Sequence, residues 1–223
     1  MLERLEKMPT NLHVDAREFT EHGRTGIARY LHNILFPLRN NADPAIALLT
    51  HDSRHIPSDL SNGGIKILTL PALPTPIVDQ FILPRIAARA DVFFSPYYKI
   101  PLPGRFRRIL TVHDIMFLRR RDYHTFHRLA SEMQLRMAVA RTDIVLVDSD
   151  FTGRDLTSLV PGADRKIRLL YPDMDEAWLQ PLPADAATRA VNTYAESRPF
   201  MLYVGNFHPH KNVDLLVRAF AGL

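Results

Sequence analysis

Apolar positions follow two different periods along this chain. Short, nearly continuous apolar runs are typical of strands buried on both faces of a parallel sheet, and apolar residues three or four positions apart are typical of helices. The runs predict strands at residues 11–16, 45–50, 65–70, 92–95, 108–112, 144–147 and 166–170. The helical spacing predicts helices at residues 27–38, 77–90, 126–141 and 151–159.

Strands and helices alternate from residue 11 to residue 171. This order predicts an α/β domain with a Rossmann-like, mainly parallel sheet and helices on both faces. Residues 172–198 contain three prolines and a weak Ala-rich helix, and we interpret them as an interdomain linker. The remaining residues, 199–223, contain an apolar run at 200–204 that predicts a strand, then a loop and a helix.

One strand and one helix cannot bury their own apolar faces, so residues 199–223 are interpreted as the incomplete start of a second domain. Their helix carries an apolar group that has no predicted partner layer, and exposed patches of this kind drive association. We therefore expect self-association at micromolar concentration. The group consists of Leu215, Leu216, Val217, Ala219 and Phe220.

The composition narrows the classes of protein that fit. The 223 residues carry a net charge of +4 and contain no cysteine, which excludes disulfides and thiolate metal sites. No apolar run resembles a signal peptide or a membrane span. We expect a cytoplasmic protein, peripheral at the inner face of the membrane.

Positive charge is concentrated in the middle of the chain, where seven arginines lie within residues 105–128. Two interpretations stay open, a solvated surface or attraction to phosphates or to an anionic membrane. A nucleic-acid partner is not expected, because aromatic stacking residues are not interleaved with the basic run.

Three loops at the carboxyl ends of predicted strands are candidate ligand sites. Thr25 and Gly26 precede a helix whose free N–H groups suit a phosphate, although two glycines before a helix also make an ordinary turn. His113 follows the strand 108–112 and is able to donate a hydrogen bond or accept a proton, or else it is structural. Lys211, just before the last helix, is a point charge for a phosphate or a plain surface lysine.

Other chemistries are disfavoured. The loop at Gly26 lacks both the G-x-G-x-x-G and the P-loop spacing. The histidine pairs at 51 and 55, 124 and 127, and 208 and 210 lack an accompanying carboxylate set, so no metal is expected. Ser149 lacks the G-x-S-x-G context of a hydrolase nucleophile and stands where the N-cap of the helix 151–159 belongs.

Six short motifs, taken together and in order, resemble family 4 glycosyltransferases. The similarity extends from about Leu12 to Leu223. The first two, Val-Asp-Ala-Arg and Thr-Gly-Ile-Ala-Arg-Tyr, are similar to the family's I-D-A-R and S/T-G-I-G-R-Y. The motifs are residues 14–17, 25–30, 95–98, 111–118, 148–156 and 203–220.

The resemblance implies a GT-B fold, in which two Rossmann-like domains face each other across a cleft. The N-terminal domain mainly binds the acceptor, the C-terminal domain binds a nucleotide-sugar, and transfer retains the anomeric configuration without a metal. It further implies that His113 contacts the transferred sugar and that Thr25, Gly26, Asn206 and Lys211 face the donor phosphates. On the acceptor side, the implied candidates are Tyr97, Asp114 and Ser149.

The chain departs from the family pattern in two places. Asn206 and His210 stand where many members carry arginine, and the downstream E-x₇-E glutamate pair has no counterpart. We therefore expect the N-terminal part of a glycosyltransferase of polysaccharide biosynthesis, truncated and with little turnover alone. The resemblance favours GDP-mannose as the donor substrate, with no further cofactor, and a glycan or lipid-linked acceptor. The alternatives are a non-catalytic binding module or one half of a split enzyme.

Overall fold

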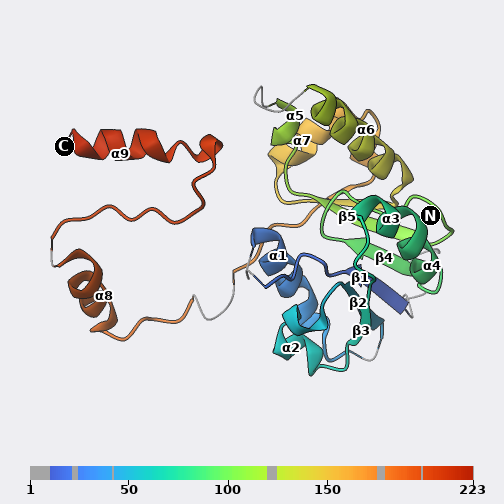
Figure 1. The fold of residues 1–223 in the computed structure, drawn as a ribbon, viewed down its shortest axis with the longest axis horizontal. Coiled ribbons are helices and arrows are strands. Elements are labelled where there is room, and N and C mark those ends of the chain that lie inside the picture. Colours follow the sequence, from blue (N-terminus) through green and yellow to red (C-terminus); the bar gives the residue numbers. More distant parts are fainter. Residues whose placement is uncertain are drawn as a thin grey trace. The chain divides into compact units, whose positions relative to one another are not determined.

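A computed structural model describes residues 11–21, 25–41, 43–119, 125–174, 179–196 and 198–222 (Figure 1). The chain divides into two compact units, Met1–Asp175 and Glu176–Leu223, which are described separately. The predicted boundaries of an acceptor-side domain, a linker and a second domain stay a prediction.

The first unit contains a seven-stranded sheet in the order β3-β2-β1-β4-β5-β6-β7, with every neighbouring pair parallel. The α/β prediction is therefore confirmed, and each predicted strand of this unit is present within one residue at either end. The strands are β1 Asn11–Asp15, β2 Ala45–Thr50, β3 Lys66–Thr69, β4 Val92–Ser95, β5 Arg107–Val112, β6 Ile144–Val147 and β7 Ile167–Leu169.

Helical segments connect consecutive strands except β4 and β5, which are joined by a loop. The longer ones agree with the predicted helices, and Pro37 lies in a short 3₁₀ turn that follows α1. The helical segments are α1 Gly26–Leu35, η1 Phe36–Leu38, η2 Ser53–His55, α2 Ser58–Ser61, α3 Thr75–Ile77, η3 Val78–Ile82, α4 Leu83–Ala87, α5 Met116–Arg119, α6 Thr125–Arg141, α7 Asp150–Leu159 and η4 Ala163–Arg165.

Both faces of the sheet are buried, as the continuous apolar runs predict. Because successive side chains of a strand point to opposite faces, Leu48 of β2 packs in one core cluster with α1 residues such as Leu31. Its neighbour Leu49 packs in another cluster with Val78 and Leu83, from the η3–α4 segment. A third cluster joins β5 and β6 to α6 and α7.

The predicted helix at residues 77–90 contains a π turn, η3, directly before α4, whose second residue is Pro84. Proline lacks an N–H and its ring clashes with the carbonyl four residues earlier, so the backbone widens there. The turn carries Asp79 and Gln80. Gln80 accepts a hydrogen bond from the Leu102 N–H at 3.3 Å, and its amide nitrogen lies 3.4 Å from the Ile100 carbonyl.

Helix α6 exposes the apolar residues that share one of its faces. Leu129 is 64% exposed and Met133 is 59% exposed, and Phe126 and Met137 are also exposed. The helix instead packs through Leu135, Ala138 and Val139, which belong to the third cluster. An apolar face normally marks the buried side of a helix, but this second face of α6 is exposed in the described part of the chain.

Arg108 does not belong to a basic surface, although it lies within the basic run of residues 105–128. Its side chain is buried and donates hydrogen bonds to five backbone carbonyls of the β4–β5 loop, those of residues 101, 102, 103, 104 and 106. The guanidinium also lies 4.2 Å from the Phe106 ring centroid. Arg108 therefore holds a loop together and is not available to an anionic ligand.

The described part of the second unit contains α8 Ala186–Ala195, the short turn η6 Pro209–Lys211 and α9 Val213–Ala221. Residues 200–204 do not form the predicted strand. A strand needs a neighbour for its backbone N–H and C=O groups, and the described residues of this unit contain none. Among the α9 side chains predicted to lack a partner layer, Leu215 is 57% and Phe220 is 50% exposed, and Leu216 is half-buried.

Candidate functional site

The strand order reverses between β1 and β4, which are neighbours at the centre of the sheet. In an open parallel sheet, ligands bind beyond the carboxyl ends of the strands at such a switch point. The loops that follow β1, β4, β5 and β6 all start at this edge. They carry most of the site residues predicted for the first unit.

The loop after β1 is anchored by a buried ion-pair network. Arg17 binds Asp15 through two hydrogen bonds, Nε to Oδ1 at 2.8 Å and Nη2 to Oδ2 at 2.5 Å. The same Nη2 lies 2.7 Å from Oδ1 of Asp79 in the π turn. Burial raises the pKa of Asp79, and the charge of Arg17 opposes this rise. The network therefore ties the β1 loop to η3, which also holds the β4 loop through Gln80.

Glu18 follows in the same loop and lies in a mixed electrostatic field. Burial raises the pKa of Glu18, and the negative charge of Asp15 raises it further. Lys99, Arg17 and His113 act in the opposite direction. A carboxylate whose charged form is disfavoured at the edge of a sheet is a candidate functional group.

His113, directly after β5, is held from both sides. Its Nδ1 lies 2.6 Å from Oδ2 of Asp148, and its Nε2 lies 2.9 Å from the Pro96 carbonyl oxygen. A carbonyl and a carboxylate both accept hydrogen bonds, so the two bonds form together when both ring nitrogens carry a proton. These two contacts hold the His113 ring in a fixed orientation.

Further side chains fix the position of the His113 ring and backbone. The ring of Tyr30 packs edge-on against it, with 4.9 Å between ring centroids. Tyr30 accepts a hydrogen bond from Thr111 at 3.3 Å, and burial raises its pKa to about 12. The Thr152 hydroxyl donates to the His113 carbonyl at 3.0 Å.

Tyr97 lies at the same edge, in the loop after β4. Burial raises its pKa, as do the neighbouring Tyr98 and the negative charges of Asp114 and Glu18. Its ring centroid lies 4.2 Å from that of Tyr98 and 5.7 Å from the Lys99 ammonium. Tyr97 thus interacts electrostatically with Asp114 and Glu18, and Glu18 interacts with His113.

Two predicted site residues serve as helix caps. The Thr25 hydroxyl accepts the Ala28 N–H at 3.0 Å, and the Ser149 hydroxyl accepts the Thr152 N–H at 3.1 Å, which confirms Ser149 as the cap of α7. Gly26 has open space where a Cβ atom would stand. A ligand is therefore free to approach the start of α1 closely at Gly26. Residues 22–24 lie outside the described residues.

Asn206 and Lys211 lie in the second unit. The Asn206 carbonyl accepts a hydrogen bond from the Tyr203 hydroxyl at 2.8 Å, and Lys211 is exposed at the end of η6. The roles inferred for all eight predicted residues stay predictions.

Several residues of this edge are missed as site residues by sequence reasoning. Asp148, Arg17 and Tyr30 belong to the quoted motifs. They would be found if every polar residue of each motif were treated as a candidate. Glu18 and Asp79 carry no motif signal, since their importance comes from burial among distant residues. Among the described residues, no group of three or more His, Cys, Asp or Glu side chains is placed to hold a metal ion. In the same part of the chain, every helix is too short or too polar to cross a membrane.

Comparison with known proteins adds a relative in sequence. Over 96 residues, the chain is 33% identical to D-inositol 3-phosphate glycosyltransferase of Kineococcus radiotolerans. The aligned part is 43% of this chain and 21% of that protein. No family model matches the chain.

Solved structures with the same fold include HepE from Anabaena. In complex with UDP and glucose it aligns with a TM-score of 0.69 and 16% identity, over 97% of this chain and 58% of HepE. The complex of HepE with UDP-glucose aligns with a TM-score of 0.61 and 15% identity, over 86% of this chain and 51% of HepE. The chain spans little more than half of HepE. These comparisons confirm the resemblance to GT-B glycosyltransferases, and the first unit has their Rossmann-like fold.

Proposed function

We propose that this chain is the N-terminal, acceptor-binding part of a retaining glycosyltransferase, which transfers a sugar from a nucleotide-sugar to a glycan or lipid-linked acceptor in polysaccharide biosynthesis. The observation that carries the proposal is the His113 arrangement at the switch point of the sheet, between Asp148 and the Pro96 carbonyl. The sequence similarity to a glycosyltransferase supports the reaction class.

The proposed chemistry uses His113 as a donor beside the transferred sugar. When the donor substrate binds, the Nε2–H exchanges its bond to the Pro96 carbonyl for one to a sugar hydroxyl, while the contact between Nδ1 and Asp148 keeps the ring oriented. Tyr97 and Asp114 face the acceptor. The free N–H groups at Gly26 approach the donor phosphates, where negative charge develops on the leaving group.

Two nucleotide-sugars follow from two different observations. The motifs favour GDP-mannose, whereas the HepE complexes contain UDP-glucose or its parts. Labelled GDP-mannose and UDP-glucose, offered separately to extracts of cells that encode the chain, distinguish them. Proton NMR of the product's anomeric coupling tests retention.

A cytoplasmic chain with peripheral contact to an anionic membrane is part of the proposal. The exposed α6 face supports it, since Phe126, Leu129 and Met133 form an apolar stripe and Arg128 and Arg141 lie on the same helix. Apolar area together with basic charge favours the surface of anionic lipids. We expect the chain to sediment with anionic vesicles but not with neutral ones. The variant Leu129→Glu should no longer sediment with anionic vesicles. Equal recovery with both kinds of vesicle would contradict the membrane part alone.

Deletion of the gene followed by complementation tests the enzyme proposal. We expect the deletion to remove one glycoconjugate and wild-type protein to restore it. His113→Gln should not restore it, although the protein is present and folded. Full restoration by His113→Gln would favour the alternative, a non-catalytic binding module. Restoration that requires a second gene product would favour one half of a split enzyme.

A further inference from the structure

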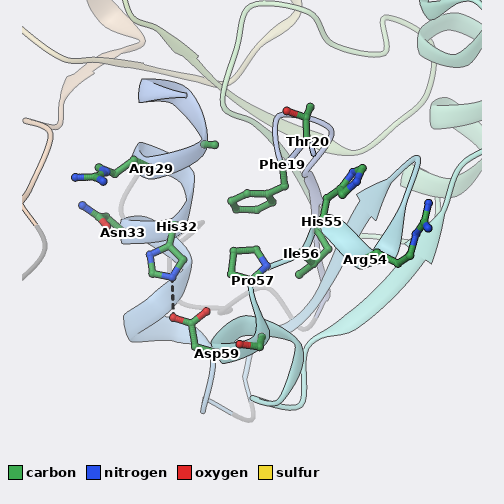
Figure 2. A pocket seen from close by; sticks show the side chains of 12 residues that line it. Phe19, Thr20, Arg29, His32, Asn33, Arg54, His55, Ile56, Pro57 and Asp59 are labelled. Carbon is green, nitrogen blue, oxygen red and sulfur yellow. Dashed lines mark hydrogen bonds and ion pairs between the residues drawn. The ribbon is translucent and has the colours of Figure 1, made fainter. Parts of the chain in front are cut away.

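A separate groove of about 540 Å³ lies between α1 and the η2–α2 segment. Figure 2 shows side chains from α1 on one wall and from residues 54–59 on the other, with Phe19 between them. Its volume is in the range of small-molecule sites. The sequence suggests only one of the lining residues as a candidate for binding, namely His55, as a metal ligand.

The groove has an apolar floor and a polar rim. Phe19 and Ile56 are buried at the floor, and Pro57 is half-buried beside them. The rim offers the Thr20 hydroxyl, imidazole and carboxylate groups and the amide oxygen of Asn33. The amide nitrogen of Asn33 already donates to the Asp173 carbonyl at 2.9 Å. Such a rim supplies both donors and acceptors.

Two charged groups of the rim, Asp59 and Arg54, already have polar partners. Asp59 lies 2.9 Å from Nε2 of His32, and Arg54 binds Asp52 through Nε and Nη2. Arg29 also lines the groove and likewise has an interaction partner. Because these charged groups are engaged, the groove suits a neutral ligand rich in hydroxyl groups better than a multiply charged one. An apolar floor under hydroxyl-binding groups matches a pyranose ring, which has C–H groups on its faces and hydroxyls around its edge.

The groove begins at the loop that also serves the switch-point site. Glu18 of this loop interacts electrostatically with His113, and the next two residues, Phe19 and Thr20, line the groove. Helix α1 is likewise shared, since it starts at Gly26 and lines the groove with Arg29, His32 and Asn33. The loop after β1 and helix α1 therefore contribute residues both to the switch-point edge and to the groove.

We propose that this groove binds neutral pyranose units of the acceptor glycan, beyond the unit that receives the new sugar. The assignment rests on the proposed glycosyltransferase function for its role, but the binding itself is independent of transfer. It commits the acceptor to an oligosaccharide of neutral sugars, and it assigns specificity for chain length to Thr20, Asn33 and Asp59.

Saturation-transfer NMR on the purified chain tests the binding directly, with maltotriose, cellotriose and mannotriose as separate probes at millimolar concentration. We expect saturation transfer to at least one trisaccharide. Ser58→Trp, which places an indole on the rim, should weaken that binding about tenfold, equivalent to about 1.4 kcal/mol. Ser53→Trp is the matched control, because Ser53 is exposed on the adjacent η2 turn and does not line the groove.

Thr20→Val removes one hydroxyl at nearly constant shape and should also weaken binding while the fold is unchanged. The groove assignment is overturned if no trisaccharide binds, or if Ser58→Trp and Ser53→Trp bind equally well. Neither outcome affects complementation by wild-type protein or its loss with His113→Gln. Conversely, full complementation by His113→Gln would remove the enzyme proposal and leave sugar binding in the groove standing.

Discussion

Replacing Arg17 by methionine should destabilise the first unit strongly. The side chains of Arg17, Asp15 and Asp79 are only 13%, 9% and 4% exposed, so all three charges are shielded from water. Methionine preserves much of the volume and removes the charge, which leaves two buried carboxylates without their shared cation. Removing one member of a buried ion pair typically costs about 3–5 kcal/mol, and we expect a loss of that size at neutral pH.

Arg54→Met is a closely matched control. Arg54 also follows an aspartate by two positions and binds it through Nε and Nη2, in the same way that Arg17 binds Asp15. The difference is exposure, since the Arg54 side chain is 84% exposed. An exposed pair of this kind contributes little, so unfolding of Arg54→Met should match that of wild type.

Equilibrium unfolding in urea, followed by circular dichroism, measures both variants. The midpoint for Arg17→Met should fall with an unchanged slope. The loss should shrink in acid, because the pKa of Asp79 is raised in the fold and protonation removes the uncompensated charge. Stability tied to a raised carboxyl pKa is present below the unfolded value and is lost as pH rises through the folded value. Equal midpoints for Arg17→Met and Arg54→Met would show that burial does not make the Arg17 ion pairs more stabilising than the Arg54 ion pair.

Three further changes test other parts of the account. Arg108→Ala should lower the free energy of unfolding by about 2–4 kcal/mol, because five carbonyls lose a charged donor. Replacing the exposed Arg105 by alanine should change this free energy by less than about 0.5 kcal/mol. Unfolding in urea compares the two variants. Glu18→Gln should raise the melting temperature at neutral pH, since the ionised form of a carboxyl with a raised pKa costs stability, and the gain should vanish as pH falls below the ordinary glutamate pKa; a gain independent of pH would contradict this. Gly26→Ala should leave the melting temperature unchanged because the space beside its Cα is open, and calorimetry should show weaker nucleotide-sugar binding if phosphate approaches there.

The sheet was predictable because its strands are buried on both faces. Leu48 and Leu49 are adjacent in the sequence and pack against helices on opposite faces, so the strand reads as a continuous apolar run. The same rule fails for residues 200–204, which are equally apolar but have no neighbouring strand in the described part of their unit. An apolar run therefore predicts the tendency of a segment to form a strand, and the partner decides the outcome.

The sequence suggests a candidate site residue only where a suitable residue type and a place after a strand end coincide. His113 and Tyr97 satisfy both conditions. Asp79 does not, because it becomes important through an ion pair with Arg17, which is distant in sequence. Arg108 shows the converse, since a basic residue in a basic run is buried against backbone carbonyls. Burial and pairing of polar groups depend on the assembled fold and leave little trace in local sequence.

The most direct test of the central claim is the transfer activity of His113→Gln in cells that encode the chain, measured together with the melting temperature of the purified variant. His51→Gln is the control, because His51 is an exposed histidine that follows β2. We expect His113→Gln to lower sugar transfer by a factor of about 100 or more while the protein stays folded. Transfer by His51→Gln should be normal. Normal transfer by His113→Gln, accompanied by a large fall in melting temperature, would show that His113 is structural and would contradict its place in the site.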